Sequence, residues 1–198
     1  MNKKNIFKYK ILNFISEKDI NQLHNIYSSS LSNDILCNFG INTKKKYIQY
    51  FLDNNNGKII VAYFKNRIIG FLFLRFKNLN MTRILDTRSI IKFLLISILN
   101  PSLPIRLIYQ ILYPIKNPKQ SCEINYFAIL RKYRSQNIGK KLINLAEKIA
   151  LKKKYDKIYT KTYNMNLVNF YFNKKKAIVL KSFKIFNYKY HYLYWKIH

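Results

Sequence analysis

The stretch Cys122–Gly139, CEINYFAILRKYRSQNIG, decides the fold, and residues 140–154, KKLINLAEKIALKKK, follow it directly. The apolar run Cys122–Leu130 predicts a strand that carries one carboxylate near its start. A basic turn containing glycine follows, and the spacing of the apolar residues after it predicts a helix over Gly139–Lys154. Backbone N–H groups converge where such a turn opens a helix, and the helix dipole favours negative charge. The stretch therefore predicts a pyrophosphate site.

The composition indicates one folded domain, residues 1–198, because apolar residues make up 49% and aromatic residues 16% of the chain. Lysine and arginine number 37 against 8 acidic residues, a formal charge of +29. This excess favours polyanionic partners such as nucleic acid, an anionic membrane surface or phosphorylated ligands. An AT-rich coding bias would also raise Lys, Asn, Ile, Tyr and Phe together. It accounts less well for the scarcity of acidic residues.

The two cysteines, Cys37 and Cys122, lack the spacing of a metal site, so we expect no metal and a reduced, cytoplasmic setting. The N-terminus has no continuous apolar segment followed by a cleavage site, so no signal peptide is expected. The longest apolar run, Ile90–Leu99, contains Lys92 and is too short to span a bilayer, which needs about 20 residues. No transmembrane segment is predicted.

The N-terminal part predicts one strand and two helices. Lys8–Phe14 has the pattern of a strand, and Ser16 with Asp19 forms a capping box that begins a helix. An apolar stripe on that helix comprises Ile20, Leu23, Ile26 and Tyr27. A second helix begins at Asn42 or Thr43 and continues to about Asp53.

A hairpin and an insertion follow. Strands over Lys58–Phe64 and Arg67–Phe76 flank the turn Lys65-Asn66, and Gly70 suggests a bulge or a close backbone approach. Residues 78–120 contain all four prolines and two apolar helical stretches, Ser89–Leu99 and Ile105–Tyr113. The insertion is either a helical flap packed on the sheet or a lid or docking surface for an acceptor, which includes a lipid-linked or membrane-adjacent one.

The C-terminal part predicts a strand, a short helix and a closing pair of antiparallel strands. They cover Lys157–Tyr163, Asn166–Lys174, Ala177–Phe186 and Tyr188–Ile197, and the last two strands turn at Asn187. The whole order is strand, two helices, hairpin, insertion, strand, phosphate turn, helix, strand, helix and two strands.

Two local patterns resemble the GCN5-related N-acetyltransferase (GNAT) family. Arg134–Gly139, RSQNIG, is similar to the acetyl-CoA signature Q/R-x-x-G-x-G/A, with Asn137 in place of the first glycine. Asparagine is the residue other than glycine that best tolerates a left-handed backbone. Asn164, with Tyr171 seven residues later, is similar to the start of the family's last short helix, although Lys174–Lys176 replaces the usual Gly-Phe. The element order extends the resemblance over nearly the whole chain outside residues 78–120.

The resemblance implies an α/β fold with a mixed, mostly antiparallel sheet flanked by helices, and acetyl-CoA as co-substrate. The residues it implies at the pyrophosphate are Arg134, Ser135, Gln136, Asn137, Ile138, Gly139 and Lys140, with Lys141 adding charge. Phe127, Ala128 and Ile129 would pair with the pantetheine arm like an added strand, and Asn164 would contact it. Tyr171 would protonate the departing CoA thiolate.

Glu123 is the candidate base, because an amine must lose a proton before or during its attack on a thioester. It precedes Ile129 by the interval at which family members with a glutamate base carry theirs. The alternative is a strand-end carboxylate paired with a lysine. His24 fits a packing or surface position, and His191, on the last strand, is a weaker candidate for the cleft.

These features predict an N-acetyltransferase that transfers an acetyl group to a primary amine by direct attack. An amino sugar or another small amine is the expected acceptor. Acetylation of an aminoacyl-tRNA would make use of the positive charge. The alternative of another class is a basic module that binds nucleic acid or tRNA and keeps the fold without turnover.

Overall fold

The structure, a computed structural model, describes residues 6–31, 34, 40–77, 84–101, 103–105, 118–185 and 187–197. Its strands form a seven-stranded sheet in the order β1-β2-β3-β4-β5-β7-β6. Among the described strands, β4 and β5 run parallel, and the other neighbouring pairs are antiparallel. The strands are β1 Lys8–Leu12, β2 Gly57–Phe64, β3 Arg67–Arg75, β4 Ser121–Ile129, β5 Lys157–Thr162, β6 Ile178–Ile185 and β7 Tyr188–Lys196. The mixed, mostly antiparallel sheet predicted from the sequence is confirmed.

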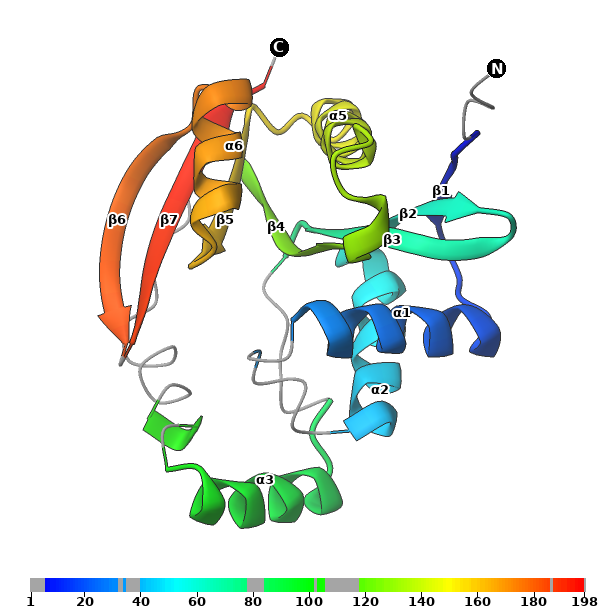
Figure 1. Cartoon of the computed structure of the whole chain (residues 1–198), viewed down its shortest axis with the longest axis vertical. Helices are drawn as coiled ribbons and strands as arrows, with labels where there is room; N and C mark the ends of the chain where they lie inside the picture. Colours follow the sequence, from blue (N-terminus) through cyan, green and yellow to red (C-terminus); the bar gives the residue numbers. More distant parts are fainter. Residues whose placement is uncertain are drawn as a thin grey trace.

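Helices cover both faces of the sheet (Figure 1). The α-helices are α1 Glu17–Ser30, α2 Gly40–Leu52, α3 Thr87–Leu99, α5 Ile138–Lys152 and α6 Met165–Lys175, and the short 3-10 helices are η2 Asp53–Asn55 and η4 Arg131–Tyr133. Side chains of a strand alternate between faces. Accordingly, Phe71 and Phe73 of β3 pack with α1 and α2, whereas Leu72 and Leu74 pack with α5. This two-sided burial explains why β3 is apolar along its whole length.

Local signals produce the start of α1 and the hairpin of β2 and β3 as predicted. The Ser16 hydroxyl accepts a hydrogen bond from the Asp19 N–H at 3.1 Å and caps α1. Lys65 and Asn66 both take positive φ, 46° and 61°, the conformation that joins two strands in a tight hairpin. The predicted start of α2 was wrong, since the helix begins at Gly40. Thr43, proposed as a cap, is instead buried inside that helix.

Gly70 combines both of the features predicted for it. The pairing of β2 with β3 shifts register between Ala62 and Tyr63, which leaves Ile69 as an extra residue beside Gly70. A Cβ atom at Gly70 would lie 3.1 Å from the Ala128 carbonyl oxygen and 3.0 Å from Ile129 Cγ1. The glycine therefore lets β3 and β4 approach closely near the end of β4.

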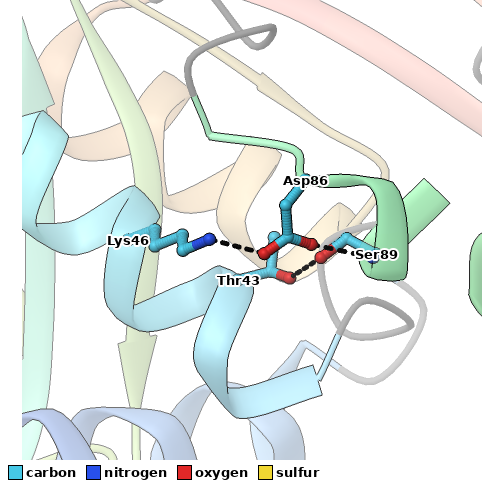
Figure 2. Close-up of polar contacts among 4 residues, drawn as sticks. All are labelled: Thr43, Lys46, Asp86 and Ser89. Carbon is cyan, nitrogen blue, oxygen red and sulfur yellow. Dashed lines mark hydrogen bonds and ion pairs between the residues drawn. The ribbon is translucent and has the colours of Figure 1, made fainter.

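Polar contacts attach α3 to α2 (Figure 2). The Thr43 and Ser89 hydroxyl groups lie 2.6 Å apart, and the Asp86 carboxylate accepts from the Ser89 N–H at 2.9 Å. The Lys46 ammonium donates to the same carboxylate at 2.5 Å. The first predicted helix of the insertion is thus present as α3. Of the second predicted helix, Ile105–Tyr113, the structure describes only Ile105. Cys37 also lies outside the described residues.

Candidate active site

The parallel strands β4 and β5 separate in the middle of the sheet. β4 pairs with β3 from Glu123 to Ile129, but its pairing with β5 runs only from Ser121 to Ile124. Opposite Leu74 the register of β4 also shifts, which leaves Asn125 as a bulge at the point of separation. Among the described strands, none pairs with the β5-facing edge of β4 beyond Ile124. Phe127, Ala128 and Ile129 therefore present main-chain groups that can accept an added strand.

The turn after β4 leads into α5 through two left-handed residues, Ser135 at φ 63° and Asn137 at φ 60°. The first α-helical hydrogen bond of α5 runs from the Lys141 N–H to the Asn137 carbonyl at 3.2 Å. The N–H groups of residues 138–140 belong to the first helical turn, which has no acceptor within the helix. Residues 134–137 are exposed, so an anion can reach these donors.

Two side chains brace this turn. Arg134 Nε donates to the Ile129 carbonyl at 3.1 Å, and Gln136 Nε2 donates to the Lys132 carbonyl at 3.3 Å. Lys140 and Lys141 are exposed at the start of α5, which places positive charge beside the free N–H groups. The turn therefore combines oriented donors with cationic side chains, the arrangement that phosphate groups favour.

Gly139 brings the turn against the unpaired edge of β4. A Cβ atom at this position would lie 3.1 Å from Phe127 Cζ and 3.3 Å from Ile129 Cδ1, closer than side chains ordinarily pack. Without that atom, α5 begins directly beside the end of β4. The oriented N–H groups and the free strand edge thus become parts of one site.

Glu123 is buried and forms an ion pair with Arg75, its partner in the register of β3 and β4. Burial opposes the charge of Arg75, but the carboxylate of Glu123, with Tyr159 and Tyr47, raises the pKa of the guanidinium above its ordinary value. Glu123 therefore faces a permanent positive charge. The partner is an arginine from the neighbouring strand, whereas the sequence suggested a lysine.

Tyrosines and a lysine surround the ion pair on the α1 and α2 face. Burial and the charge of Glu123 raise the pKa of Tyr159, and its side chain also hydrogen-bonds to Arg75. Asn125 Nδ2 donates to the Tyr47 hydroxyl at 2.5 Å. Burial lowers the pKa of Lys161, and the negative charge of Glu123 opposes that shift. Sequence reasoning missed these residues. The available signal was Arg75, a charge at the end of the apolar run of β3.

Tyr171 lies on the opposite face of the sheet, buried and stacked on Trp195 with ring centroids 5.0 Å apart. Burial raises the pKa of Tyr171, and a hydrogen bond with the Thr160 side chain opposes that shift. The Thr160 hydroxyl donates to the Ile124 carbonyl at 3.0 Å, and these two residues form the last pair between β4 and β5. The Tyr171 hydroxyl thus ends where the strands separate.

The remaining candidates have structural partners. Asn164 caps α6, since its side-chain oxygen accepts from the Asn166 N–H at 3.0 Å. His191 Nδ1 lies 2.9 Å from the Ser182 hydroxyl, between β6 and β7. Cys122 is buried, its Sγ lies 3.9 Å from the Lys157 carbonyl, and burial raises the pKa of its thiol to about 12. His24 lies on α1, where burial lowers its pKa.

Comparisons with known proteins agree with this geometry. Residues 20–174 match the profile of the Acetyltransferase (GNAT) family. The chain therefore belongs to the GNAT family of acetyltransferases. No curated protein matches it.

The fold is similar to solved acetyltransferase structures. The NatC complex bound to Gag peptide and CoA contains a chain with TM-score 0.63 and 15% identity, with 97% of this chain and 99% of that chain covered. The ribosomal-protein-alanine N-acetyltransferase from Brucella melitensis gives 0.62 and 10%, with 97% and 99% covered. The ribosomal-protein-S18-alanine N-acetyltransferase from Escherichia coli gives 0.59 and 7%, with 96% and 94% covered. At these identities the likeness concerns the fold alone.

Within the described residues, no helix is long and apolar enough to cross a membrane.

Proposed function

We propose that the protein transfers the acetyl group of acetyl-CoA to a primary amine by direct attack. The observation that carries this proposal is the unpaired edge of β4. This edge begins where β4 and β5 separate, at a point flanked by the Glu123 and Tyr171 side chains, and it ends at the turn before α5. The Glu123 and Tyr171 side chains lie on opposite faces of the sheet, beside the point where β4 and β5 separate. A thioester in that separation would have a carboxylate on one side and a phenol on the other.

The cofactor would be bound mainly by main-chain groups. Its pyrophosphate would accept hydrogen bonds from the N–H groups of residues 136–140, with Arg134, Lys140 and Lys141 supplying charge. The pantetheine arm would pair with the free edge at residues 127–129, and the side-chain nitrogen Nδ2 of Asn164 would donate to it, since the Asn164 backbone N–H already bonds to the Thr162 hydroxyl. The left-handed backbone at Asn137 and the absent side chain at Gly139 support this fit.

The chemistry would divide between the two faces. Glu123, held in place by Arg75, would take the proton of the attacking amine directly or through a water molecule. A backbone N–H near Ile129 would stabilise the developing oxyanion. Tyr171 would return a proton to the departing thiolate. Because burial raises its pKa, Tyr171 keeps that proton at neutral pH.

Calorimetric titration with acetyl-CoA at moderate salt tests the proposal. Micromolar binding is expected, and absence of binding would remove its basis. Release of the CoA thiol would then be followed with amino sugars, a peptide with a free N-terminus and an aminoacyl-tRNA. Which of them accelerates release identifies the acceptor class.

A second candidate function, nucleic-acid binding, is favoured by the formal charge of +29. Exposed lysines lie at the C-terminal ends of two helices, Lys152–Lys154 at the end of α5 and Lys174 with Lys176 at the end of α6. Phosphate contacts make such binding steeply dependent on salt. Loss of tRNA and DNA binding at about 0.15 M salt, where specific contacts persist, would remove this candidate.

A further inference from the structure

Helix α3 presents an aliphatic surface to solvent. Five of its side chains are between 45% and 77% exposed, namely Ile90, Ile91, Leu94, Leu95 and Ile98. They follow one another along one side of a 13-residue helix, which is about 20 Å long. A continuous surface of this kind marks a site of interaction, whereas isolated exposed leucines need no explanation.

The opposite side of α3 is fixed to the body of the protein. Ser89 and Phe93 are buried there, and Ser89 meets the Thr43 hydroxyl at 2.6 Å (Figure 2). The N-cap Asp86 accepts from Lys46 of α2. The inward side therefore packs Phe93 into the core and holds Ser89 by its contact with Thr43, while five isoleucine and leucine side chains face outward. An ordinary surface helix carries polar residues on its outward side, so this outward aliphatic surface is unusual, and the polar contacts with α2 fix its orientation.

The charge of the molecule distinguishes between the possible occupants of this surface. Arg88 and Lys92 are exposed on α3 itself, and the whole chain carries +29. Two copies meeting through α3 would bring like charges together. An anionic lipid surface attracts the same charges, at about 1 kcal/mol for each basic residue near the membrane. Charge complementarity thus favours lipid over a second copy of the chain.

We propose that α3 binds in the interface of an anionic phospholipid bilayer, with its axis parallel to the membrane plane. The five aliphatic side chains enter the acyl-chain boundary and Arg88 contacts lipid phosphates, whereas the Lys92 ammonium lies beside Gly40 of α2. Figure 1 places α3 at the end of the molecule away from the strands, so the bilayer can reach it without obstruction by the sheet. The inference is independent of the proposed acetyl transfer.

Flotation of the full chain with phosphatidylcholine vesicles, with and without phosphatidylglycerol, tests the proposal. The variant Ile91→Gln/Leu95→Gln removes aliphatic surface without changing charge. The matched control Ile178→Gln/Leu180→Gln changes two exposed aliphatic residues of β6. Wild type and control should float with phosphatidylglycerol vesicles. The affinity of the α3 variant for these vesicles should be at least about tenfold lower. Equal binding of all three proteins would overturn the proposal, because charge alone would then explain it.

A second measurement detects insertion directly. The variant Leu94→Trp places an indole on the exposed side of α3, and brominated acyl chains should quench its added fluorescence. Absence of quenching in floated protein would place α3 outside the acyl region and overturn the proposal. The proposal would also be overturned if the wild type failed to float but formed a dimer that Ile91→Gln/Leu95→Gln dissociates. A second copy of the chain would then cover α3. Unchanged circular dichroism of the variants excludes misfolding.

Discussion

Asn137 occupies a left-handed backbone position at φ 60° where the GNAT signature has glycine. Asparagine accepts this conformation better than other residues with a Cβ atom. We expect Asn137→Ala to lower the free energy of unfolding by about 1 kcal/mol, whereas Asn137→Gly should stay within about 1 kcal/mol of wild type. Urea unfolding measures both. Equal stabilities of the alanine and glycine variants would show that the left-handed turn is not retained.

Glu123→Gln separates the proposed base from the binding site. Turnover should fall about a hundredfold or more, since general-base assistance is lost. Acetyl-CoA affinity, measured by titration calorimetry, should change less than about twofold because the pyrophosphate turn lies at the other end of β4. Unchanged turnover would remove Glu123 as the base.

A stability control belongs with this variant. Glu123→Gln leaves Arg75 without its counter-ion, and breaking a buried pair costs about 3–5 kcal/mol. Because about a fifth of the Arg75 side chain is exposed, at 22%, we expect a smaller loss. Kinetics should therefore be compared at a temperature where thermal scans show both proteins folded.

At the scale of elements, Asp86 makes the attachment of α3 dependent on pH. Hydrogen bonds from Lys46 and Ser89 lower the pKa of the Asp86 carboxyl well below its ordinary value. Its contribution to stability is therefore complete above the unfolded-state pKa, about 3.9, and is lost as the pH falls through the lower folded-state pKa.

The variant Asp86→Asn tests this attachment. It should be less stable than wild type at neutral pH, and the difference should shrink as the pH falls below about 4. Thermal unfolding across that range measures it. Equal stabilities of the two proteins at every pH would show that the cap, which asparagine retains, and not the charge of Asp86 holds the helix.

Elements with local signals could be predicted, and those fixed by distant contacts could not. Ser16 caps α1 within its own turn, and Lys65-Asn66 closes its hairpin alone, so both were readable in the sequence. The start of α2 was misplaced because Thr43 looks like a cap. Its hydroxyl instead meets Ser89, 46 positions later in the chain.

The same distinction applies to the candidate site. The turn before α5 is a contiguous motif, so Asn137 and Gly139 stood out in the sequence. Arg75 reaches Glu123 only through the register of β3 with β4, and Tyr159 joins them from β5. No local pattern encodes that register, so the charged surroundings of Glu123 emerged only from the assembled sheet.

At the scale of the whole molecule, the chain carries a formal net charge of +29, and these excess positive charges repel one another in the folded state. Raising NaCl from about 0.01 M to about 0.1 M shortens the screening length from about 30 Å to about 10 Å. We expect the melting temperature to rise by about 3 °C for each kcal/mol of repulsion removed. Calorimetry in two monovalent salts measures it. A melting temperature that falls with salt would mean that attractive pairs dominate.

The Cys122 thiol can report how often β4 and β5 separate by local unfolding. Its thiol lies inside the short parallel pairing of β4 with β5, with a pKa of about 12. An alkylating reagent can react with it only when those strands part, so the labelling rate of a Cys37→Ser protein measures the frequency of that opening. A ligand that bridges the two strands should lower this labelling rate. The Cys122 thiol thus reports the stability of the paired strand ends directly beside the point where β4 and β5 separate.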